Sequence, residues 1–572
     1  MADLVKRNEP EDGILDLLRL WYADMVLGGT AHRMTMTDNR LSMAVRLRDI
    51  EAANVSEKGL VMRQSDDQSQ QTASAFTSSN VSMASTQFGV LPTALPKCYS
   101  QPHEKITTSP SASTLPSDDV ELPPQKYSKP IRDMRWIWMT IYQRLCLMVF
   151  VPNIVAIVWL AIQYDPFHIP LSHISTAVAA NATAAIIMRQ ELVINWLFRL
   201  AAKCPRSAPL RIRRLLAKVY HFGGIHSGAG IATTVWFTML NATLLWRWQT
   251  NSIVGLPQDE FHHVLFLTIL IDVLLILMVV FAHPELRRLY HNAFEGVHRF
   301  AGWSIVVLFW IHVVELTAVQ EETTSDGSPR PLGAALVRTP AIYLLLIITV
   351  SLIVPWLRLR RVPVQVELLS DHASRWHFSY TNVKLCSANR VTDKPLKEWH
   401  SFAAIPDPDD RGFSVIVSNA GDWTSRLIQN PPKKLWVRGV PTFGVLHMGV
   451  VFNSLVLVAT GSGIGPILSL LTDRSISFRI LWSARDPVHT YSKDIMDKVF
   501  AADQNAVVLD TSKFVADGGA TRRPDLLRMS YGLYRQSSAE AVFVISNQKV
   551  TEKLIFGLES RGVPAFAPIF DS

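Results

Sequence analysis

The chain has 572 residues, of which 48% are hydrophobic and only 18% charged, and its formal net charge is +8. A soluble chain of this length is usually nearer a quarter charged and divides into two or more regions. The apolar excess therefore indicates either one large core or membrane spans, and the positions of the apolar residues distinguish the two. The four cysteines have no CxxC spacing, which argues against a disulfide framework, a zinc site or a cysteine-ligated cluster.

The first part of the chain is polar. Residues 1–130 are rich in Ser, Thr, Gln and Pro, a composition that predicts a disordered cytosolic region. Residues 14–22 could form a short amphipathic helix, which we interpret as transient, with a membrane-surface anchor as the alternative. The first residues hold no apolar signal-peptide core, so no signal peptide is expected.

Six apolar blocks follow, and each is long enough to cross a membrane, which needs about 20 helical residues. They show almost no polar face, whereas the helices of a soluble bundle carry one. The sequence therefore predicts an all-α, six-helix transmembrane domain over residues 131–360. The predicted spans are 137–164, 174–200, 225–246, 262–282, 298–319 and 334–357.

Basic residues gather before the first span, between spans two and three, between spans four and five, and after span six. These loops all fall on one side of the membrane, so the positive-inside rule places both termini in the cytosol. The chain is expected to be a multi-pass membrane protein, with the plasma membrane as its location and the lipid bilayer as a partner. Because topology accounts for the basic charge, no nucleic-acid partner is expected.

From Val362 onward the chain has the composition of a soluble module. Short β-rich runs come first alone and then alternate with helical stretches, an order that predicts a β subdomain followed by an α/β subdomain with a parallel sheet. We place these subdomains at residues 361–450 and 451–572. The runs lie at 362–369, 413–418, 434–440, 454–460, 478–484, 506–510 and 541–546.

A glycine-rich turn joins a hydrophobic strand to a helix at residues 455–468. Glycines let a pyrophosphate approach the backbone, and the helix N-terminus offers free amides, so this turn predicts a nicotinamide-nucleotide site. The residues assigned to it are Gly461, Ser462, Gly463, Gly465 and Pro466. Arg485 ends the next predicted strand, where an arginine suits the 2′-phosphate of NADPH better than NADH, although it could equally be a surface residue.

Three further segments resemble motifs of the ferric reductases and NADPH oxidases, a family of transmembrane flavoproteins. Residues 398–403 (Glu-Trp-His-Ser-Phe-Ala) resemble the HPFT flavin motif, and residues 421–424 (Gly-Asp-Trp-Thr) resemble the second flavin motif. Residues 437–444 resemble the GPYG segment that precedes the nicotinamide strand. Order and spacing match over 362–572, and the likeness is strongest to the fungal TmpA-like branch, whose members are linked to development and signalling.

The resemblance implies a ferredoxin-reductase-like module, with a β-barrel subdomain for FAD and an α/β subdomain for NAD(P)H. The implied flavin ligands are His400, Ser401, Phe402, Gly421 and Thr424, and the implied aromatic of the C-terminal tail is Phe570. Two departures stand out. The late strand ends in Ser546-Asn547 where related reductases carry Cys-Gly, and HPFT has become His-Ser-Phe-Ala.

Related ferric reductases ligate two haems through a histidine pair on each of two spans. Span five keeps that spacing, since His298 and His312 are 14 residues apart, which is ~21 Å along a helix. Span three offers only His221 and His226 near its cytosolic end. The sequence therefore leaves open whether one haem binds between His226, or His221, and His298, and it argues against a second haem.

The expected function is a transmembrane flavoprotein oxidoreductase that passes electrons from NAD(P)H through FAD to an unidentified acceptor at or across the membrane. The alternative is a catalytically weak or inactive membrane regulator that keeps the reductase fold, as the two departures and the incomplete histidine set suggest. A transporter or channel fits the spans but gives no role to the C-terminal motifs.

Overall fold

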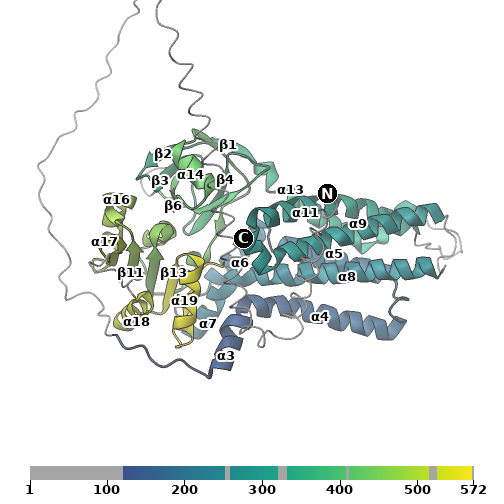
Figure 1. The fold of residues 1–572 in the computed structure, drawn as a ribbon, viewed down its shortest axis with the longest axis horizontal. Coiled ribbons are helices and arrows are strands. Elements are labelled where there is room, and N and C mark those ends of the chain that lie inside the picture. The colour runs from purple at the N-terminus through teal and green to yellow at the C-terminus, as the bar shows by residue number, and fades with distance from the viewer. Residues whose placement is uncertain (1–119, 251–257, 320–330, 408–410, 515–524, 570–572) are drawn as a thin grey trace, which may run out of the picture. The chain divides into compact units, whose positions relative to one another are not determined.

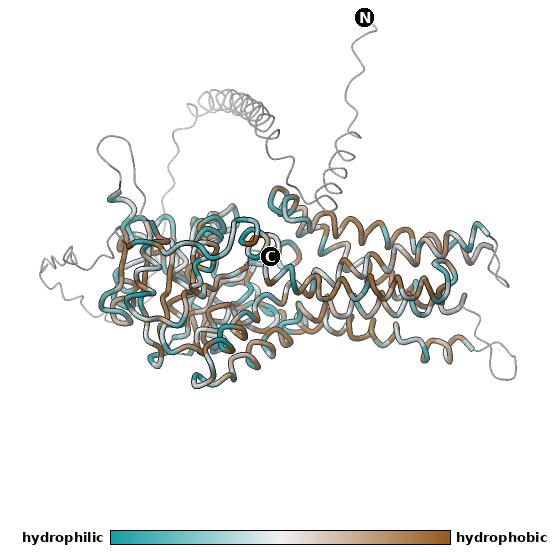
Figure 2. Tube along the Cα trace, turned by 90° about the horizontal axis from the view of Figure 1, so that it is seen from below, coloured by the Kyte–Doolittle hydropathy of each residue, from teal (hydrophilic) through white to brown (hydrophobic). Residues whose placement is uncertain are grey.

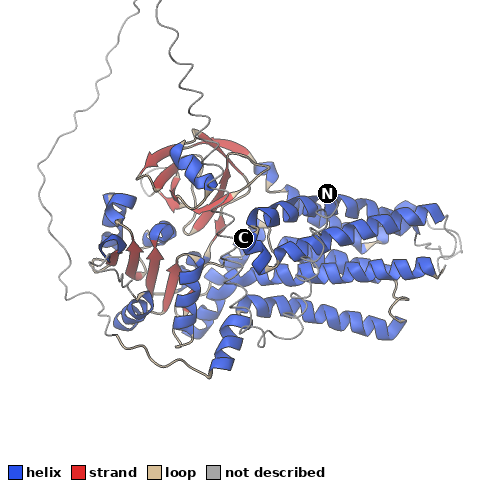
Figure 3. Cartoon of the chain, in the orientation of Figure 1, coloured by secondary structure: helices blue, strands red, loops and turns tan. Residues whose placement is uncertain are grey.

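A computed structural model describes residues 120–250, 258–319, 331–407, 411–514 and 525–569. The predicted disordered region therefore lies outside the described residues as far as residue 119. The described residues all belong to one compact unit, which begins at Thr107. In the described residues, helices make up the first part, and every strand lies after Leu359 (Figure 3).

The helical part is a bundle of long apolar helices (Figures 1 and 2). The elements are α3 (Lys129–Asp133), η1 (Met134–Trp138), α4 (Ile141–Tyr164), α5 (Leu171–Ile187), α6 (Glu191–Ala202), α7 (Leu210–Leu216), η2 (Ala217–Phe222), α8 (Gly223–Gln249), α9 (Gln258–Ala282), α10 (Pro284–Leu289), α11 (His291–Val319), α12 (Leu332–Arg338), α13 (Pro340–Ile353) and η3 (Trp356–Arg358). Within the described residues, five helices are long and apolar enough to cross a membrane, or six if one bent pair counts as a span.

Two predicted spans differ from the observed helices. The block 174–200 is not one straight helix, because α5 ends at Ile187 and α6 continues at an angle of 68°. The block 334–357 is divided between α12 and α13, since Pro340 disfavours helical backbone at Thr339 and starts a new helix.

Two glycines set the crossing of α4 and α8. A side chain at Gly224 would overlap the carbonyl oxygen of Tyr142, and one at Gly228 would overlap that of Cys146. The absence of side chains lets the two backbones approach closely. The outer surface of the bundle exposes large apolar side chains such as Phe266, which is 65% exposed.

Two antiparallel sheets follow and share one core that α14 (Asp422–Gln429) closes at one end. One sheet has the order β1-β8-β4-β5, with β9 beside β4, and the other has the order β2-β3-β7-β6. Their strands are β1 (Arg360–Pro363), β2 (Gln365–Leu368), β3 (Ala373–Phe378), β4 (Ser387–Thr392), β5 (His400–Ala403), β6 (Ile405–Pro406), β7 (Phe413–Ser418), β8 (Lys434–Val437) and β9 (Thr442–Phe443).

A parallel sheet of order β12-β11-β10-β13-β14 completes the described chain. Alternate side chains of its strands enter two buried clusters, one on each face. Its strands are β10 (Ser454–Thr460), β11 (Ser477–Ala484), β12 (Val507–Asp510), β13 (Ala541–Ile545) and β14 (Ala565–Phe566). Its helices are η4 (Val445–Val451), η5 (Gly461–Gly463), α15 (Ile464–Leu471), α16 (Pro487–Tyr491), α17 (Lys493–Ala502), η6 (Thr511–Phe514), α18 (Leu526–Gln536) and α19 (Gln548–Glu559). All seven predicted runs contain strands, and six observed strands lie outside those runs, namely β3, β4, β5, β6, β9 and β14.

The basic segment after α6 binds the parallel-sheet half rather than remaining in solvent. Arg213 donates from two nitrogens to Glu540, over 2.7 and 2.9 Å, and its side chain is 7% exposed. Arg214 donates to the backbone carbonyl of Glu540 over 2.8 Å, and Lys218 pairs with Glu559 at 2.7 Å. Basic residues that we interpreted as topology signals therefore also fasten the C-terminal half to the helical part.

Candidate functional site

The glycine-rich turn lies where the strand order of the parallel sheet reverses. β10 is central, with β11 on one side and β13 on the other, so the turns after β10 and β13 lie side by side at one edge of the sheet. Open α/β sheets bind nucleotides at this switch point. Gly461 adopts a positive φ of 52°, which favours glycine, and a side chain at Gly463 would overlap the carbonyl oxygen of Ile545.

Side chains from neighbouring elements hold this turn in place. The indole Nε1 of Trp482 donates to the carbonyl oxygen of Gly461 over 2.9 Å. The hydroxyls of Thr460 and Ser546 lie 2.6 Å apart and form one hydrogen bond. Ser546 stands where related reductases carry cysteine, so a hydroxyl pair occupies that position in this chain.

The predicted flavin residues His400, Ser401 and Phe402 lie on β5, the edge strand of its sheet. The His400 ring stacks on Trp423, with centroids 4.0 Å apart, and Phe402 packs beside the same indole. Ser401 is exposed, and β4 is the only strand with which β5 pairs in the described part of the chain. The unpaired edge leaves backbone groups free for a ligand lying along the strand.

Thr424 is already engaged within its own turn. Its hydroxyl accepts from the amides of Ala420 and Gly421, over 3.0 and 3.1 Å, and donates to the carbonyl of Gly421. The geometry therefore makes Thr424 the residue that shapes the start of α14. Gly421 is exposed, and a side chain there would meet open space, so this turn has room for a ligand.

Tyr491, which sequence reasoning missed, lies against the nucleotide turn. Its side chain is 2% exposed, and its hydroxyl lies beside Gly461 of the turn. Burial raises the pKa of this phenol, and Ser462 and Ser418 partly oppose the rise. Gly465 also packs against Ile416 of β7. The two predicted cofactor segments are therefore brought to one place.

A second cluster links β5 to the last helix of the bundle. The Arg438 guanidinium lies between two indoles, 4.7 Å from the Trp356 ring and 4.5 Å from the Trp399 ring. Trp303 of α11 lies 5.8 Å from Trp356. Burial lowers the pKa of Arg438 to about 10, with a further contribution from Arg390. Trp399 directly precedes His400, so this cluster fixes the start of the predicted flavin strand.

The remaining predicted cofactor residues are less constrained. Arg485 is exposed directly after β11, on the same edge of the sheet as the glycine turn. Pro466 lies in the first turn of α15, where its missing amide removes no helical hydrogen bond. Phe570 lies outside the described residues. The neighbouring Phe566 is fully buried against Phe543 and Phe452.

His226 and His298 face each other across α8 and α11, with ring centroids 6.0 Å apart. His226 uses Nδ1 in a 2.8 Å hydrogen bond to the Ala185 carbonyl, which leaves Nε2 for another partner. The buried Nδ1 of His298 has no hydrogen-bond partner, and the same holds for Nδ1 of His221 on η2. The described residues include no group of three or more His, Cys, Asp or Glu suited to a metal.

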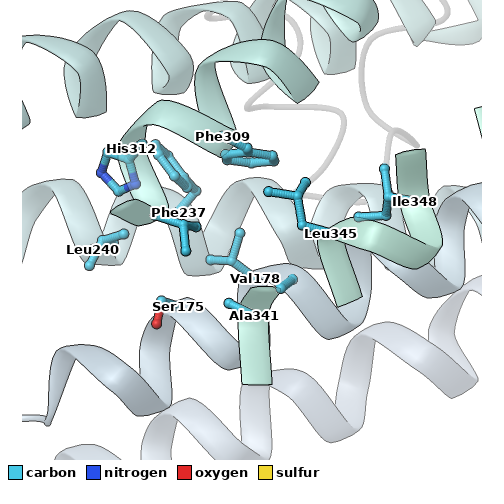
Figure 4. A pocket seen from close by; sticks show the side chains of 11 residues that line it. Ser175, Val178, Phe237, Leu240, Phe309, His312, Ala341, Leu345 and Ile348 are labelled. Atoms are coloured by element: carbon cyan, nitrogen blue, oxygen red, sulfur yellow. The ribbon is translucent and has the colours of Figure 1, made fainter. Parts of the chain in front are cut away.

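The Nε2 atom of His312, unlike that of His226, already has a hydrogen-bond partner. This Nε2 bonds to the Thr268 hydroxyl over 2.8 Å, and the residue is 2% exposed. Beside it lies a cavity of about 20 Å³, with Phe237 and Phe309 among its apolar lining (Figure 4). Such a volume holds one water, far less than a porphyrin needs. The residues around His312 therefore do not fit a haem.

Comparison with known proteins relates the chain to one group of fungal reductases. Residues 445–572 match the family model "Adenylate-forming reductase 03009, C-terminal domain". Adenylate-forming reductase 03009 of Coprinopsis cinerea is 41% identical over 456 residues, which is 79% of this chain and 42% of that protein. A match over so much of the chain must include the helical part. The chain spans less than half the length of this relative.

Two further similarities are more limited. NADPH oxidase 1 of Mus musculus is 36% identical over 81 residues, 13% of this chain. Among solved structures, a ferredoxin NADP+ reductase from Neisseria gonorrhoeae with bound FAD and NADP matches at 13% identity, with 37% of this chain and 98% of that one covered and a TM-score of 0.29.

Proposed function

We propose that this chain is a membrane-embedded flavoprotein oxidoreductase that takes a hydride from NADPH and passes electrons to an acceptor at or across the membrane. The observation that carries the proposal is the contact between the nucleotide turn and β7. Gly465 packs against Ile416 of β7, five residues before Gly421, and the Tyr491 hydroxyl lies beside Gly461 of the same turn. This contact supports the proposal, because transfer between two bound cofactors requires their binding segments to lie close together.

The residues fit the two cofactors in different ways. FAD, when bound, takes up a hydride and releases electrons singly. His400 and Ser401 would bind it along the free edge of β5, with Gly421 giving access for its phosphates. Gly461 and Gly463 would receive the nucleotide pyrophosphate at the start of α15. NADPH is favoured over NADH because Arg485 lies exposed at the end of β11.

A haem, if one is present, belongs between His226 and His298 and not at His312. The inner pair has facing rings, a free Nε2 on His226 and an unsatisfied Nδ1 on His298. His312 is already hydrogen-bonded beside a water-sized cavity. On this proposal, electrons have a place to enter the bundle at its cytosolic end. The outer half would hold no second haem.

A second candidate function follows from the relative in Coprinopsis cinerea, which is named an adenylate-forming reductase. In that case the nucleotide half would give its hydride to an activated acyl group. The observation favouring it is the match of residues 445–572 to the C-terminal domain of such a reductase. NADPH oxidation would then require an acyl adenylate and would persist without flavin.

The test uses the full chain purified in detergent. The spectrum should show flavin absorbance, and anaerobic NADPH should bleach it, with re-oxidation on adding ferricyanide. NADH should act at least about tenfold more slowly, as expected if Arg485 binds the 2′-phosphate.

Two other outcomes would reject this proposal. A chain that binds flavin but shows no bleaching with either nucleotide would be the regulator that keeps only the fold. NADPH oxidation that starts only with a synthetic acyl adenylate, in protein without flavin, would establish the second candidate.

A further inference from the structure

Helix α6 has two opposite faces with different surroundings. One face is buried and contains Glu191, Ile194, Asn195, Phe198 and Ala201. The other exposes a stripe of large apolar side chains, namely Leu192 (51% exposed), Trp196 (59%) and Leu200 (54%). Their spacing of four residues puts them on one side of the helix. A surface helix in water normally carries polar residues at such positions.

The buried face holds the segment that leads from β8 into the nucleotide half. The Glu191 carboxylate is 3% exposed, and it accepts from Arg390 over 2.8 Å and from the amide of Val440 over 2.7 Å. The Asn195 amide donates to the Pro441 carbonyl over 2.8 Å and accepts from the Phe443 amide over 3.0 Å.

Apolar contacts complete this buried face. Ile194 and Phe198 belong to the same buried cluster as the core of the parallel sheet. The contacts on one face of α6 therefore bind it firmly to the reductase half, while its other face remains exposed.

The exposed stripe continues into basic residues at the end of the helix. Arg199 and Lys203 are exposed, and they lie seven and eleven residues after Leu192. The Arg199 guanidinium also lies 5.9 Å from the ring of Phe443 in the reductase half. Apolar side chains together with Lys and Arg on one exposed face are typical of helices that lie in the boundary of an anionic membrane. Tryptophan is also enriched at that boundary.

The position of α6 in the chain also favours a location at the membrane boundary. It follows α5, an apolar helix of 17 residues, after a break of three residues and a bend of 68°. If α5 crosses the membrane, α6 must turn toward the membrane plane. Figure 1 shows α6 at the end of the bundle that meets the reductase half, so α6 would then run along the membrane surface.

We propose that α6 lies in the cytosolic boundary of the bilayer, with Leu192, Trp196 and Leu200 among the acyl chains and Arg199 and Lys203 at anionic headgroups. This inference rests on the proposed membrane insertion of the bundle. The opposite face of α6 binds the segment from Val440 to Phe443. The bilayer therefore holds the reductase half in a fixed position against the membrane helices.

The experiment places a photo-crosslinking amino acid in the full chain, reconstituted in nanodiscs of phosphatidylcholine with phosphatidylserine. One variant carries it in place of Trp196. A second carries it at Phe266, which is 65% exposed on α9, and a third at Val488, which is 52% exposed on α16. Flavin absorbance and a single size-exclusion peak verify that each variant is folded.

We expect position 196 to crosslink lipid about as well as position 266, and about tenfold better than position 488. Replacing Arg199 and Lys203 with Gln should remove the preference for phosphatidylserine over phosphatidylcholine. Lipid adducts at 266 without adducts at 196 would overturn the proposal for α6 alone. No adduct at 266 would instead overturn membrane insertion. A crosslinked dimer through position 196 would assign the stripe to a second copy of the chain.

Discussion

Gly463 is the residue of the nucleotide turn with the least room for a side chain. Any Cβ there would overlap the carbonyl oxygen of Ile545, which is backbone and cannot move independently of β13. Gly463→Ala should therefore displace the turn and raise the KM for NADPH by at least about tenfold, or about 1.4 kcal/mol. Steady-state NADPH oxidation measures this change, and flavin absorbance should remain as in the original chain.

Gly333→Ala is the matched control, because its Cβ would meet nothing within 4 Å. It should leave the KM unchanged and slightly stabilise α12, since alanine favours helix over glycine. Equal effects of the two substitutions would mean that the turn does not bind the nucleotide.

The histidines of the bundle differ in what their ring nitrogens can bind. If haem is present, His226→Ala and His298→Ala should each abolish its Soret absorbance, because both rings face the same space. His312→Ala should retain that absorbance and lower thermal stability, because it leaves the Thr268 hydroxyl without this partner. A Soret band that disappears only with His312→Ala would contradict the placement at the inner end.

At the scale of elements, one ion pair fastens α7 to the start of β13. Arg213 and Glu540 form a bidentate contact, with side chains 7% and 18% exposed. Removing one partner of a largely buried pair costs about 3 kcal/mol. Arg213→Ala should therefore lower the melting temperature of the C-terminal half and make it more sensitive to protease. Lys549→Ala, an exposed lysine on α19, should change stability by less than about 0.5 kcal/mol.

The same pair predicts a dependence on pH. Burial alone raises the pKa of the Glu540 carboxyl, but hydrogen bonds and charge from Arg213 outweigh burial and hold that pKa below its ordinary value. A carboxyl with a depressed folded pKa stabilises the fold above its unfolded pKa of about 4.3, and this stabilisation is lost as pH falls further.

Melting temperatures measured from pH 7 down to pH 4 and below should follow this pattern. Glu540→Gln should melt lower at pH 7 and lose less stability on acidification. If the melting temperatures of Glu540→Gln and of the original chain fell equally with pH, the Arg213–Glu540 pair would be excluded as a source of the pH dependence.

For the whole molecule, insertion of the bundle in a membrane predicts that the segments joining its helices lie alternately on the two sides of that membrane. Residue 168 lies between α4 and α5, and residue 207 lies between α6 and α7. In a chain whose native cysteines are replaced by serine, Ser207→Cys should react with an impermeant maleimide only from the cytosolic side. His168→Cys should react only from the other side.

Detergent permeabilisation provides the control, since both cysteines should then react. Reaction of both cysteines from the same side of intact membranes would mean that α5 does not cross.

Local sequence pattern predicted the parts of this protein that depend on neighbouring residues. The apolar blocks form long helices because each residue's hydrogen bonds and apolar surface are satisfied within or around one segment. The strand before Gly461 and the helix after it could be predicted because alternating burial and glycine conformation are local properties. β5 was harder to predict, since His400 to Ala403 is too short for a periodic signal.

Only the tertiary structure decided which distant residues meet. Tyr491 belongs to no motif, and it reaches the nucleotide turn because α16 packs beside it. Arg213 and Glu540 are 327 residues apart, so no local pattern could pair them. The bend before α6 is likewise stabilised from outside, by contacts of Glu191 and Asn195 with the reductase half. The sequence by itself determined most of the helices and strands and predicted the cofactor turns, whereas packing between distant segments decided which of these elements lie together.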